Sequence, residues 1–372
     1  WYHTSGLEPN QKTNNLKQGM NKRIIGLDVA RAIAIIGMII VNFKVVLSNA
    51  KPDWLSDWAS LLDGKFSAVF VVLAGLGIAF MTKNKKGIEE QKIARLRVLK
   101  RALFLFLLGL LFYLVWPADI LHFYGIYMLI TALVLYASPR LLLILSTTLI
   151  LGYFLLISTF SYEESWNFET FEYADFWTVK GFFRNLMFNG FHPVIPWVSF
   201  MLFGLWLGRQ DLQDGYFVRK IFRLSGIMYL LIQVSSILIL QLFSGVSSEE
   251  YELVKVIFGT APMPPMPIYM FQGLAFSTFV ISGCILFSSR HIQNRWIQGL
   301  AAMGRMALTI YIVHVFLGIG VFYESIESGN PLSLSFVLVY ALSFSFLCLL
   351  FSDFWLRKFK SGPFEWLMRK VT

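Results

Sequence analysis

Hydrophobic residues gather along the chain in runs of about twenty, separated by short charged segments. Runs of this length match the ~20 residues that a helix needs to cross the hydrocarbon core of a bilayer. They do not alternate apolar and polar positions, as the strands of a membrane β-barrel would. The pattern therefore predicts an all-α, polytopic integral membrane protein.

Counting the runs predicts roughly ten transmembrane helices, each near the length that a bilayer requires. The expected spans are 24–48, 66–82, 102–116, 119–137, 141–160, 191–208, 221–243, 266–289, 302–321 and 332–355. Two glycines in the second span, Gly75 and Gly77, predict close helix contact. Residues 20–372 are expected to form a single transmembrane domain. Residues 1–19 are polar and patternless, and we expect them to be partly non-native, with Met20 close to the natural start.

Charge fixes the expected orientation. Basic residues collect between alternate spans, with eight Lys or Arg in 83–101 alone, while residues 161–190 and 244–265 are acidic. The positive-inside rule then places both termini in the cytoplasm and predicts an ordered, partly helical outer segment at 161–190.

Composition agrees with a membrane protein and argues against a nucleic-acid-binding protein. The chain is 56% hydrophobic and 15% charged, with a mean hydropathy of +0.63, whereas soluble domains carry about 25% charged residues. A net charge of +10 would suggest nucleic-acid binding in a soluble protein. The basic residues follow topology and form no nucleic-acid motif, so no nucleic-acid partner is expected.

The first span carries polar groups that a plain anchor would not need, because charge inside a bilayer is costly and usually marks a site. Asp28 and Arg31 are three residues apart and can pair on one helix face. They form either a structural ion pair or part of a substrate path. Asn42 lies in the outer half and is either a contact between helices or a member of an active site.

Histidines supply the candidate general base. His122 and His192 each begin a span at the expected outer face, and His314 lies within the ninth span. With Asn42 and the corner formed by Asp63 and Lys65, they can build one polar cluster in the outer half. Alternatively, the histidines at the span ends are merely interfacial. Their spacing does not suit a metal site, so no metal is expected.

Two arginines near the inner face, Arg209 and Arg305, are candidate ligands for the phosphates of a CoA-type donor, because arginine pairs with phosphate bidentately. The alternative is that they report topology alone. Composition does not separate the two interpretations.

Several stretches together resemble the heparan-α-glucosaminide N-acetyltransferase catalytic family and its bacterial relatives of unknown function. They are RIIGLDVARAIAIIGMIIVNF, LLDGKFSAVFVVLAGLGIAF, DILHFYGIYMLI, FNGFHPVIPWVSFMLFGLWLGR, GRMALTIYIVH and GPFEW, in the family's order. The resemblance implies a transmembrane acyltransferase of a bacterial inner membrane. Such an enzyme would move an acyl group, expected to be acetyl, from cytoplasmic acyl-CoA to a sugar amine or hydroxyl of a glycan or glycolipid on the far side.

The resemblance also implies site residues. The family's catalysis is assigned to an asparagine late in the first helix, which Asn42 matches, and to a histidine in the following loop. That loop reads KPDWLSDW here and has no histidine, and Ala32 replaces the usual glycine. Either His122 or His192 then serves as base, or the chemistry has changed.

Two other functions stay open. A transporter or exporter would use Asp28, Arg31 and Asn42 to line a substrate path, and a non-catalytic membrane scaffold would use them only to hold helices together. Partners beyond the lipid bilayer, and association with further copies of the chain, are not determined by composition.

Overall fold

The computed structural model describes residues 23–48, 54–85, 87–168, 170–322 and 331–372. The tail at residues 1–19 lies outside these residues. The elements, in chain order, are α2 (Ile25–Leu47), α3 (Trp54–Ser60), α4 (Lys65–Thr82), α5 (Ile88–Tyr113), α6 (Leu121–Leu133), α7 (Pro139–Thr159), β1 (Trp166–Asn167), β2 (Glu172–Tyr173), α8 (Val179–Arg184), η1 (Asn185–Asn189), α9 (Val194–Leu207), α10 (Gly215–Leu242), α11 (Ser248–Phe258), α12 (Pro267–Arg290), α13 (Arg295–Arg305), α14 (Ala307–Val313), η2 (His314–Ile319), η3 (Gly320–Phe322), α16 (Leu334–Lys358) and α17 (Pro363–Val371).

The long helices confirm an all-α membrane architecture. Six helices of the described residues are long and apolar enough to cross a membrane: α2, α3 with α4, α7, α10, α12 and α16. Two bent pairs raise the number to as many as eight, with α8–η1 meeting α9 at 49° and α13 meeting the helix after it at 75°. The ninth expected span is therefore a broken helix, because the chain turns at Met306 between α13 and α14.

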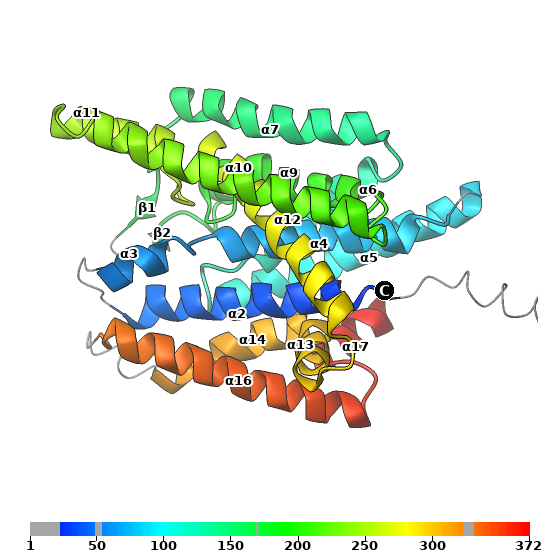
Figure 1. Cartoon of the computed structure of the whole chain (residues 1–372). Helices are drawn as coiled ribbons and strands as arrows, with labels where there is room; N and C mark the ends of the chain where they lie inside the picture. Colours follow the sequence, from blue (N-terminus) through cyan, green and yellow to red (C-terminus); the bar gives the residue numbers. More distant parts are fainter. Residues whose placement is uncertain (1–22, 49–53, 86, 169, 323–330) are drawn as a thin grey trace, which may run out of the picture.

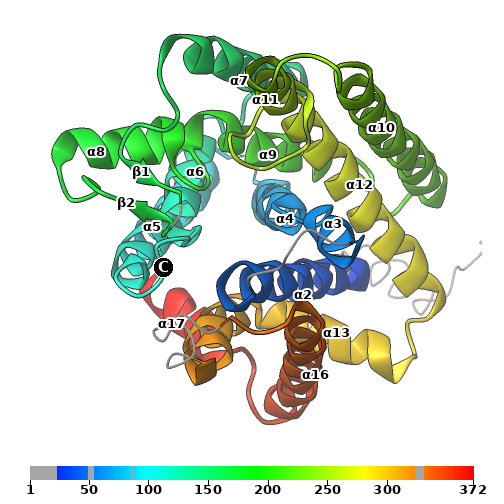
Figure 2. The same cartoon turned by 90° about the vertical axis from the view of Figure 1, so that its left-hand side faces the viewer.

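The helices form a bundle around α4. Figure 2 shows α4 near the middle, with α2, α5, α6, α9 and α12 around it. Two helices lie at the periphery, where α7 packs on α9 and α10 packs on α12. Only 11% of the apolar stretch of α10 is buried, as expected for a helix whose other faces meet lipid.

Glycines set the spacing between α4 and α9. A Cβ at Gly75 would lie 2.0 Å from the Met201 carbonyl oxygen, and a Cβ at Gly204 would lie 2.1 Å from the Val72 carbonyl oxygen. The two backbones can approach this closely only without side chains at these positions. Gly75 therefore makes the predicted contact. Gly77 does not, since its nearest neighbour is the Arg31 side chain at 3.9 Å.

The two ends of the bundle differ in charge, and Figure 1 shows which elements lie at each end. The basic end holds the start of α2, the end of α4, the start of α5 and the C-terminal helix α17. The acidic end holds α3, α11 and the two-stranded hairpin β1–β2, in which Trp166 pairs with Tyr173. The segment 161–190 thus contains strands as well as the expected helix. Arg184 holds it by ion pairs to Glu164 and, at 2.7 Å, to Asp175.

Candidate functional site

The basic end carries an ion cluster on the first turns of α2. Asp28 is 4% exposed and accepts from Arg31 and, at 2.6 Å, from Arg23. Asp28 and Arg31 lie three residues apart on one helix face, as their spacing suggested. Arg23 is a partner that the sequence did not indicate.

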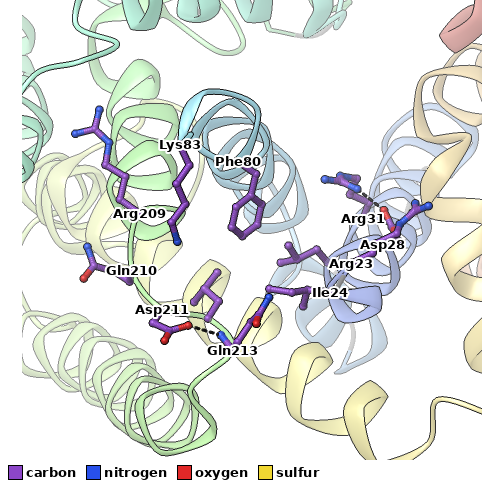
Figure 3. A pocket seen from close by; sticks show the side chains of 12 residues that line it. Arg23, Ile24, Asp28, Arg31, Phe80, Lys83, Arg209, Gln210, Asp211 and Gln213 are labelled. Carbon is purple, nitrogen blue, oxygen red and sulfur yellow. Dashed lines mark hydrogen bonds and ion pairs between the residues drawn. The ribbon is translucent and has the colours of Figure 1, made fainter. Parts of the chain in front are cut away.

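This cluster is the shared wall of two cavities. The first cavity, of about 520 Å³, lies between the start of α2, the end of α4 and the loop after α9 (Figure 3). The second cavity, of about 490 Å³, opens beside α17 and runs inward between α2, α4, α5 and α6. Arg23, Asp28 and Arg31 line both.

The mouth of the second cavity is strongly cationic. Six basic residues line it, against two acidic ones: Arg23, Arg31, Arg101, Arg305, Lys360 and Arg369 against Asp28 and Glu365. A cleft lined by one sign of charge focuses its field and attracts ligands of the opposite sign. The mouth is therefore suited to a polyanion.

The inner walls of the second cavity are apolar stripes from three helices. Phe70, Leu73, Ala74, Gly77 and Ile78 come from α4, Leu105 from α5, and Leu121, Tyr124 and Met128 from α6. These spacings of three and four residues put each set on one helix face. Phe70 and Ile78 are about 12 Å apart along the helix. The cavity thus continues from the basic mouth toward Leu121, the residue before His122.

The two predicted phosphate-binding arginines lie in different cavities. Arg305 lines the second cavity, and its guanidinium also donates to the Lys360 carbonyl at 3.3 Å. Arg209 lines the first cavity and donates to the carbonyls of Ala137, at 2.5 Å, and Leu135, at 2.6 Å. Arg209 thereby fixes the turn that joins α6 to α7.

Asn42 has a histidine partner from a distant part of the chain. Its amide nitrogen lies 2.9 Å from Nε2 of His314, which is 1% exposed. His314 Nδ1 contacts the Tyr311 carbonyl oxygen, which can only accept, so Nδ1 carries the proton. In neutral His314, Nε2 is then an acceptor, and Asn42 donates to it. The second amide hydrogen and the oxygen of Asn42 stay available for another group.

His122 forms a dyad with Asp119. Both side chains are fully buried, and Asp119 Oδ2 accepts from Nδ1 of His122 at 3.0 Å. The other ring nitrogen, Nε2, is buried and has no hydrogen-bond partner among the described residues. A carboxylate that fixes one ring nitrogen and leaves the other free is the usual way to orient a general base.

Tyr311 connects the two histidine sites. Its hydroxyl donates to Asp119 Oδ1 at 3.2 Å, and its carbonyl oxygen accepts from His314. Asn42, His314, Tyr311, Asp119 and His122 therefore form one polar network across α2, α14–η2 and the start of α6. His314 begins the π-helical segment η2, and such segments occur frequently at functional sites.

Aromatic rings cover His122 on the acidic end. Tyr113 and Phe176 stack with centroids 3.7 Å apart, and both meet the His122 ring edge-on. Phe176 lies in the loop between the hairpin and α8. The network is thus separated from the acidic end by a two-ring cover.

The remaining candidates lie at the acidic end. Asp63 accepts from Lys44 at 2.6 and 2.7 Å, which accounts for a lysine late in the first span. Lys65 is 1% exposed at the start of α4. His192 packs edge-on against Trp197 with centroids 4.5 Å apart, and it also contacts the Phe123 ring, which neighbours the His122 ring.

Sequence reasoning missed Tyr311, Asp119 and Glu365 as site residues. Glu365, in the GPFEW stretch, accepts from the amides of Leu308 and Thr309 at 2.7 and 3.1 Å. It therefore caps α14 where that helix restarts after the bend. The i, i+3 spacing of Asp119 and His122 was a usable signal for the dyad, but nothing local indicated Tyr311 or Glu365. No group of three or more His, Cys, Asp or Glu among the described residues is arranged to hold a metal.

Comparison with known proteins agrees with this architecture. The sequence profile described as "Heparan-alpha-glucosaminide N-acetyltransferase, catalytic" matches residues 23–239, and that of a protein of unknown function (DUF418) matches residues 213–372. The chain is 25% identical to "Uncharacterized protein YeiB" of Escherichia coli (strain K12), over 94% of this chain and 96% of the relative. It is 23% identical to "Uncharacterized protein YxaH" of Bacillus subtilis (strain 168), over 95% and 94%.

Proposed function

The chain belongs to the heparan-alpha-glucosaminide N-acetyltransferase catalytic family, and from this premise we propose that it is a membrane-embedded acyltransferase. It takes an acyl group, acetyl in the simplest case, from cytoplasmic acyl-CoA and transfers it to a sugar or glycolipid on the other side of the membrane. One observation carries the proposal: a cavity with a cationic mouth extends to the residue before His122, within a buried network that includes Asn42.

The proposed topology has ten spans in a bacterial inner membrane, with both termini in the cytoplasm. The eight spans that the described helices allow become ten when α5 and α6 also cross. Neither helix has the length and composition of a complete apolar span. The first half of α5 is rich in charged residues, and α6 has only 13 residues. The basic end then faces the cytoplasm by the positive-inside rule.

The donor would occupy the second cavity. Arg305, Arg369 and Arg101 are placed at the mouth to pair with the phosphates of CoA, since arginine recognises phosphate bidentately. The narrow apolar part along α4 and α6 suits the pantetheine arm, which is long and only sparsely polar. The thioester would then arrive beside Leu121.

The polar network would perform the transfer. His122 Nε2 accepts the proton of the acceptor hydroxyl or amine while Asp119 orients the ring. The acceptor oxygen or nitrogen bonds to the acyl carbon, and the carbon–sulfur bond breaks. The amide of Asn42, held by His314, donates to the developing oxyanion. His122 returns the proton to the leaving thiolate, which releases free CoA.

His314 and His192 receive different roles in this scheme. His314 is a positioning residue, because its Nε2 is engaged by Asn42 and its Nδ1 by a backbone carbonyl. His192, whose ring lies near the Phe123 ring beside His122, is assigned to the acceptor side.

The test is acyl transfer by purified protein with radiolabelled acetyl-CoA, measured as labelled acceptor in a membrane glycolipid extract and as slow hydrolysis without acceptor. His122→Gln is expected to lower turnover by roughly 10²–10⁴-fold, the usual contribution of a general base, while acetyl-CoA binding measured by calorimetry is retained. His291→Gln, at the exposed end of α12, is the matched control and should be unchanged.

Two outcomes would overturn the proposal. A wild-type protein that neither binds nor hydrolyses acetyl-CoA is not an acyl-CoA-dependent acyltransferase. Movement of a solute across proteoliposomes without any acyl donor, equally sensitive to His122→Gln, would instead identify a transporter.

A further inference from the structure

Four polar side chains meet at the acidic end between α4, α9 and α12 without a role in the network just described. They are Lys65, Trp197, Tyr269 and His192. Lys65 is 1% exposed, and Trp197 and Tyr269 are fully buried. Ring contacts join the set, because His192 meets Trp197 and the Trp197 and Tyr269 rings lie 6.2 Å apart between centroids. The Lys65 ammonium lies 5.9 Å from the Tyr269 ring centroid.

Three of these side chains carry a buried polar atom that has no hydrogen-bond partner among the described residues: Trp197 Nε1, Tyr269 hydroxyl oxygen and His192 Nδ1. Buried polar groups in proteins are nearly always paired, so a cluster of such atoms calls for an explanation. The indole nitrogen can only donate, and the hydroxyl carries a proton to donate. The cluster therefore requires an acceptor-rich partner.

The charge of this region is positive. The acidic neighbour of Lys65 is Asp63, which is already bonded to Lys44 at 2.6 and 2.7 Å. Two ammonium groups thus share one carboxylate. Lys65 also stands at the N-terminal end of α4, where the helix dipole adds positive potential, and the preceding Gly64 provides no side-chain cap. A buried positive charge of this kind is costly unless an anion is present.

We infer that Lys65, Trp197, Tyr269 and His192 bind an anionic group, a phosphate or a carboxylate, at the acidic end of the bundle. The ammonium supplies the charge, and the indole and phenol groups donate to the oxygens. His192 and His122 both pack near the Phe123 ring, with centroids 6.1 and 4.0 Å from that ring. An anion held there is therefore next to the proposed base.

This site narrows the class of acceptor, a step that rests on the proposed function. The acceptor would be an acidic glycan or glycolipid, whose phosphate or carboxylate anchors in the cluster while its hydroxyl or amine reaches His122. A neutral sugar would leave Lys65 and Lys44 to share the single carboxylate of Asp63. The anion site itself needs no acyl transfer and is tested separately.

The test is a thermal-shift titration of the purified full-length protein with inorganic phosphate, and in a parallel arm with acetate. All variants carry Arg305→Gln and Arg369→Gln, so that the basic mouth contributes less to anion binding. Tyr269→Phe keeps the ring and removes only the unpaired hydroxyl, and Lys65→Gln removes the charge. Lys180→Gln, an 84% exposed lysine in α8, is the matched control.

Phosphate is expected to raise the melting temperature of the parent. Its apparent affinity should fall about tenfold in Lys65→Gln and severalfold in Tyr269→Phe, as expected for lost hydrogen bonds to a charged group, and should stay unchanged in Lys180→Gln. Stabilisation by acetate in place of phosphate, with the same dependence on Lys65, would support a carboxylate ligand.

Absence of any anion effect on the parent, or an equal effect in all variants, would show that the cluster holds only water and would overturn the inference. Because no acyl donor is present, this failure is distinct from a failure of acyl transfer. Conversely, a protein without acyltransferase activity would still show the titration if the anion site exists.

Discussion

The basic mouth and the buried polar network use opposite electrostatic arrangements within one bundle. At the mouth, charged groups are numerous and partly open to water, with the Arg23 and Arg31 side chains 57% and 29% exposed. In the network, Asp119 and His122 are 0% exposed, and each named polar side chain is fixed by a specific partner. The first arrangement suits attraction of a ligand, and the second suits precise orientation of reacting groups.

The basic mouth and the polar network behave differently because the mouth is open to water, which has a high dielectric constant, whereas the network is buried in a low-dielectric interior. Charges near water act over distance but are screened by salt, and rearrange easily around ligands of varied shape. Buried hydrogen bonds act over short distances, are stronger in a low dielectric, and hold one geometry. Changes at the mouth should therefore alter donor affinity and its salt dependence. Changes in the network should alter turnover instead.

After His122→Gln, the largest expected effect comes from removing cations at the mouth. Arg305→Gln combined with Arg369→Gln should raise the KM for acetyl-CoA by about tenfold or more, because each charge-assisted contact to phosphate contributes roughly 1.5–3 kcal/mol before screening. The kcat should change little, since such contacts are made equally in the ground and transition states. KM and kcat measured at two salt concentrations would check this.

Arg290→Gln is the control for that experiment, because Arg290 is exposed at the end of α12 and lines neither cavity. A fall in kcat at unchanged KM would contradict the division of roles between the mouth and the network.

A second prediction concerns the close contact between the backbones of α4 and α9. Gly204→Val should destabilise the protein by about 1–3 kcal/mol or more, because its side chain would overlap the Val72 backbone. Thermal unfolding in detergent measures the loss. Gly152→Ala is the matched control, since a Cβ there meets nothing within 4 Å, and should be neutral or slightly stabilising. Equal melting temperatures for both variants would show that the close approach of α4 and α9 is not required.

The smallest expected effect is a pH dependence at the cover over His122. Burial alone would raise the pKa of Asp175, but hydrogen bonds from Ser165 and Arg184 outweigh it and hold the pKa below its ordinary value. A depressed pKa stabilises the fold above the unfolded value of about 3.9 and loses that contribution as pH falls through the folded value. Asp175→Asn should therefore lower the melting temperature at pH 7 and flatten the decline of the melting temperature as the pH falls below about 4.

The exposed Asp57 at the same end provides the control variant Asp57→Asn. If the melting temperature of Asp175→Asn falls with acidification as much as that of the wild type, the pH dependence arises from other carboxylates.

Sequence reasoning was most successful where local patterns carry the information. Each of the ten expected ranges overlaps helical residues of the structure, because a run of apolar residues is a local property. Among the described residues, however, only six helices, or eight with the bent pairs, are long and apolar enough to span a membrane. The bend at Met306 was not predicted, since the chain is helical on both sides of it. The strands β1 and β2 were missed because each has only two residues.

Polar contacts likewise fall into two groups, those between residues close in sequence and those between residues far apart in sequence. Asp28 and Arg31 are three residues apart in α2, and helix geometry alone places the pair on one face. Asp119 and His122 have the same spacing, but Asp119 precedes α6, and its carboxylate accepts from both the backbone and the ring of His122. Asn42 and His314 are 272 residues apart, and no local pattern links them. The resemblance directed attention to the loop after the first span, of which residues 49–53 lie outside those described. The structure instead supplies a histidine from η2.

The sequence by itself thus determined the class of protein, the approximate positions of its apolar helices and the sign of charge at each end. Only the tertiary structure decided which helix faces meet, for example that Gly75 lies against α9 and Gly77 does not. It likewise decided that Asn42 meets His314, and that Lys65, Trp197 and Tyr269 converge. The physical reason is that hydropathy, charge and helical periodicity act along the chain, whereas a site is assembled by packing between helices that are distant in sequence.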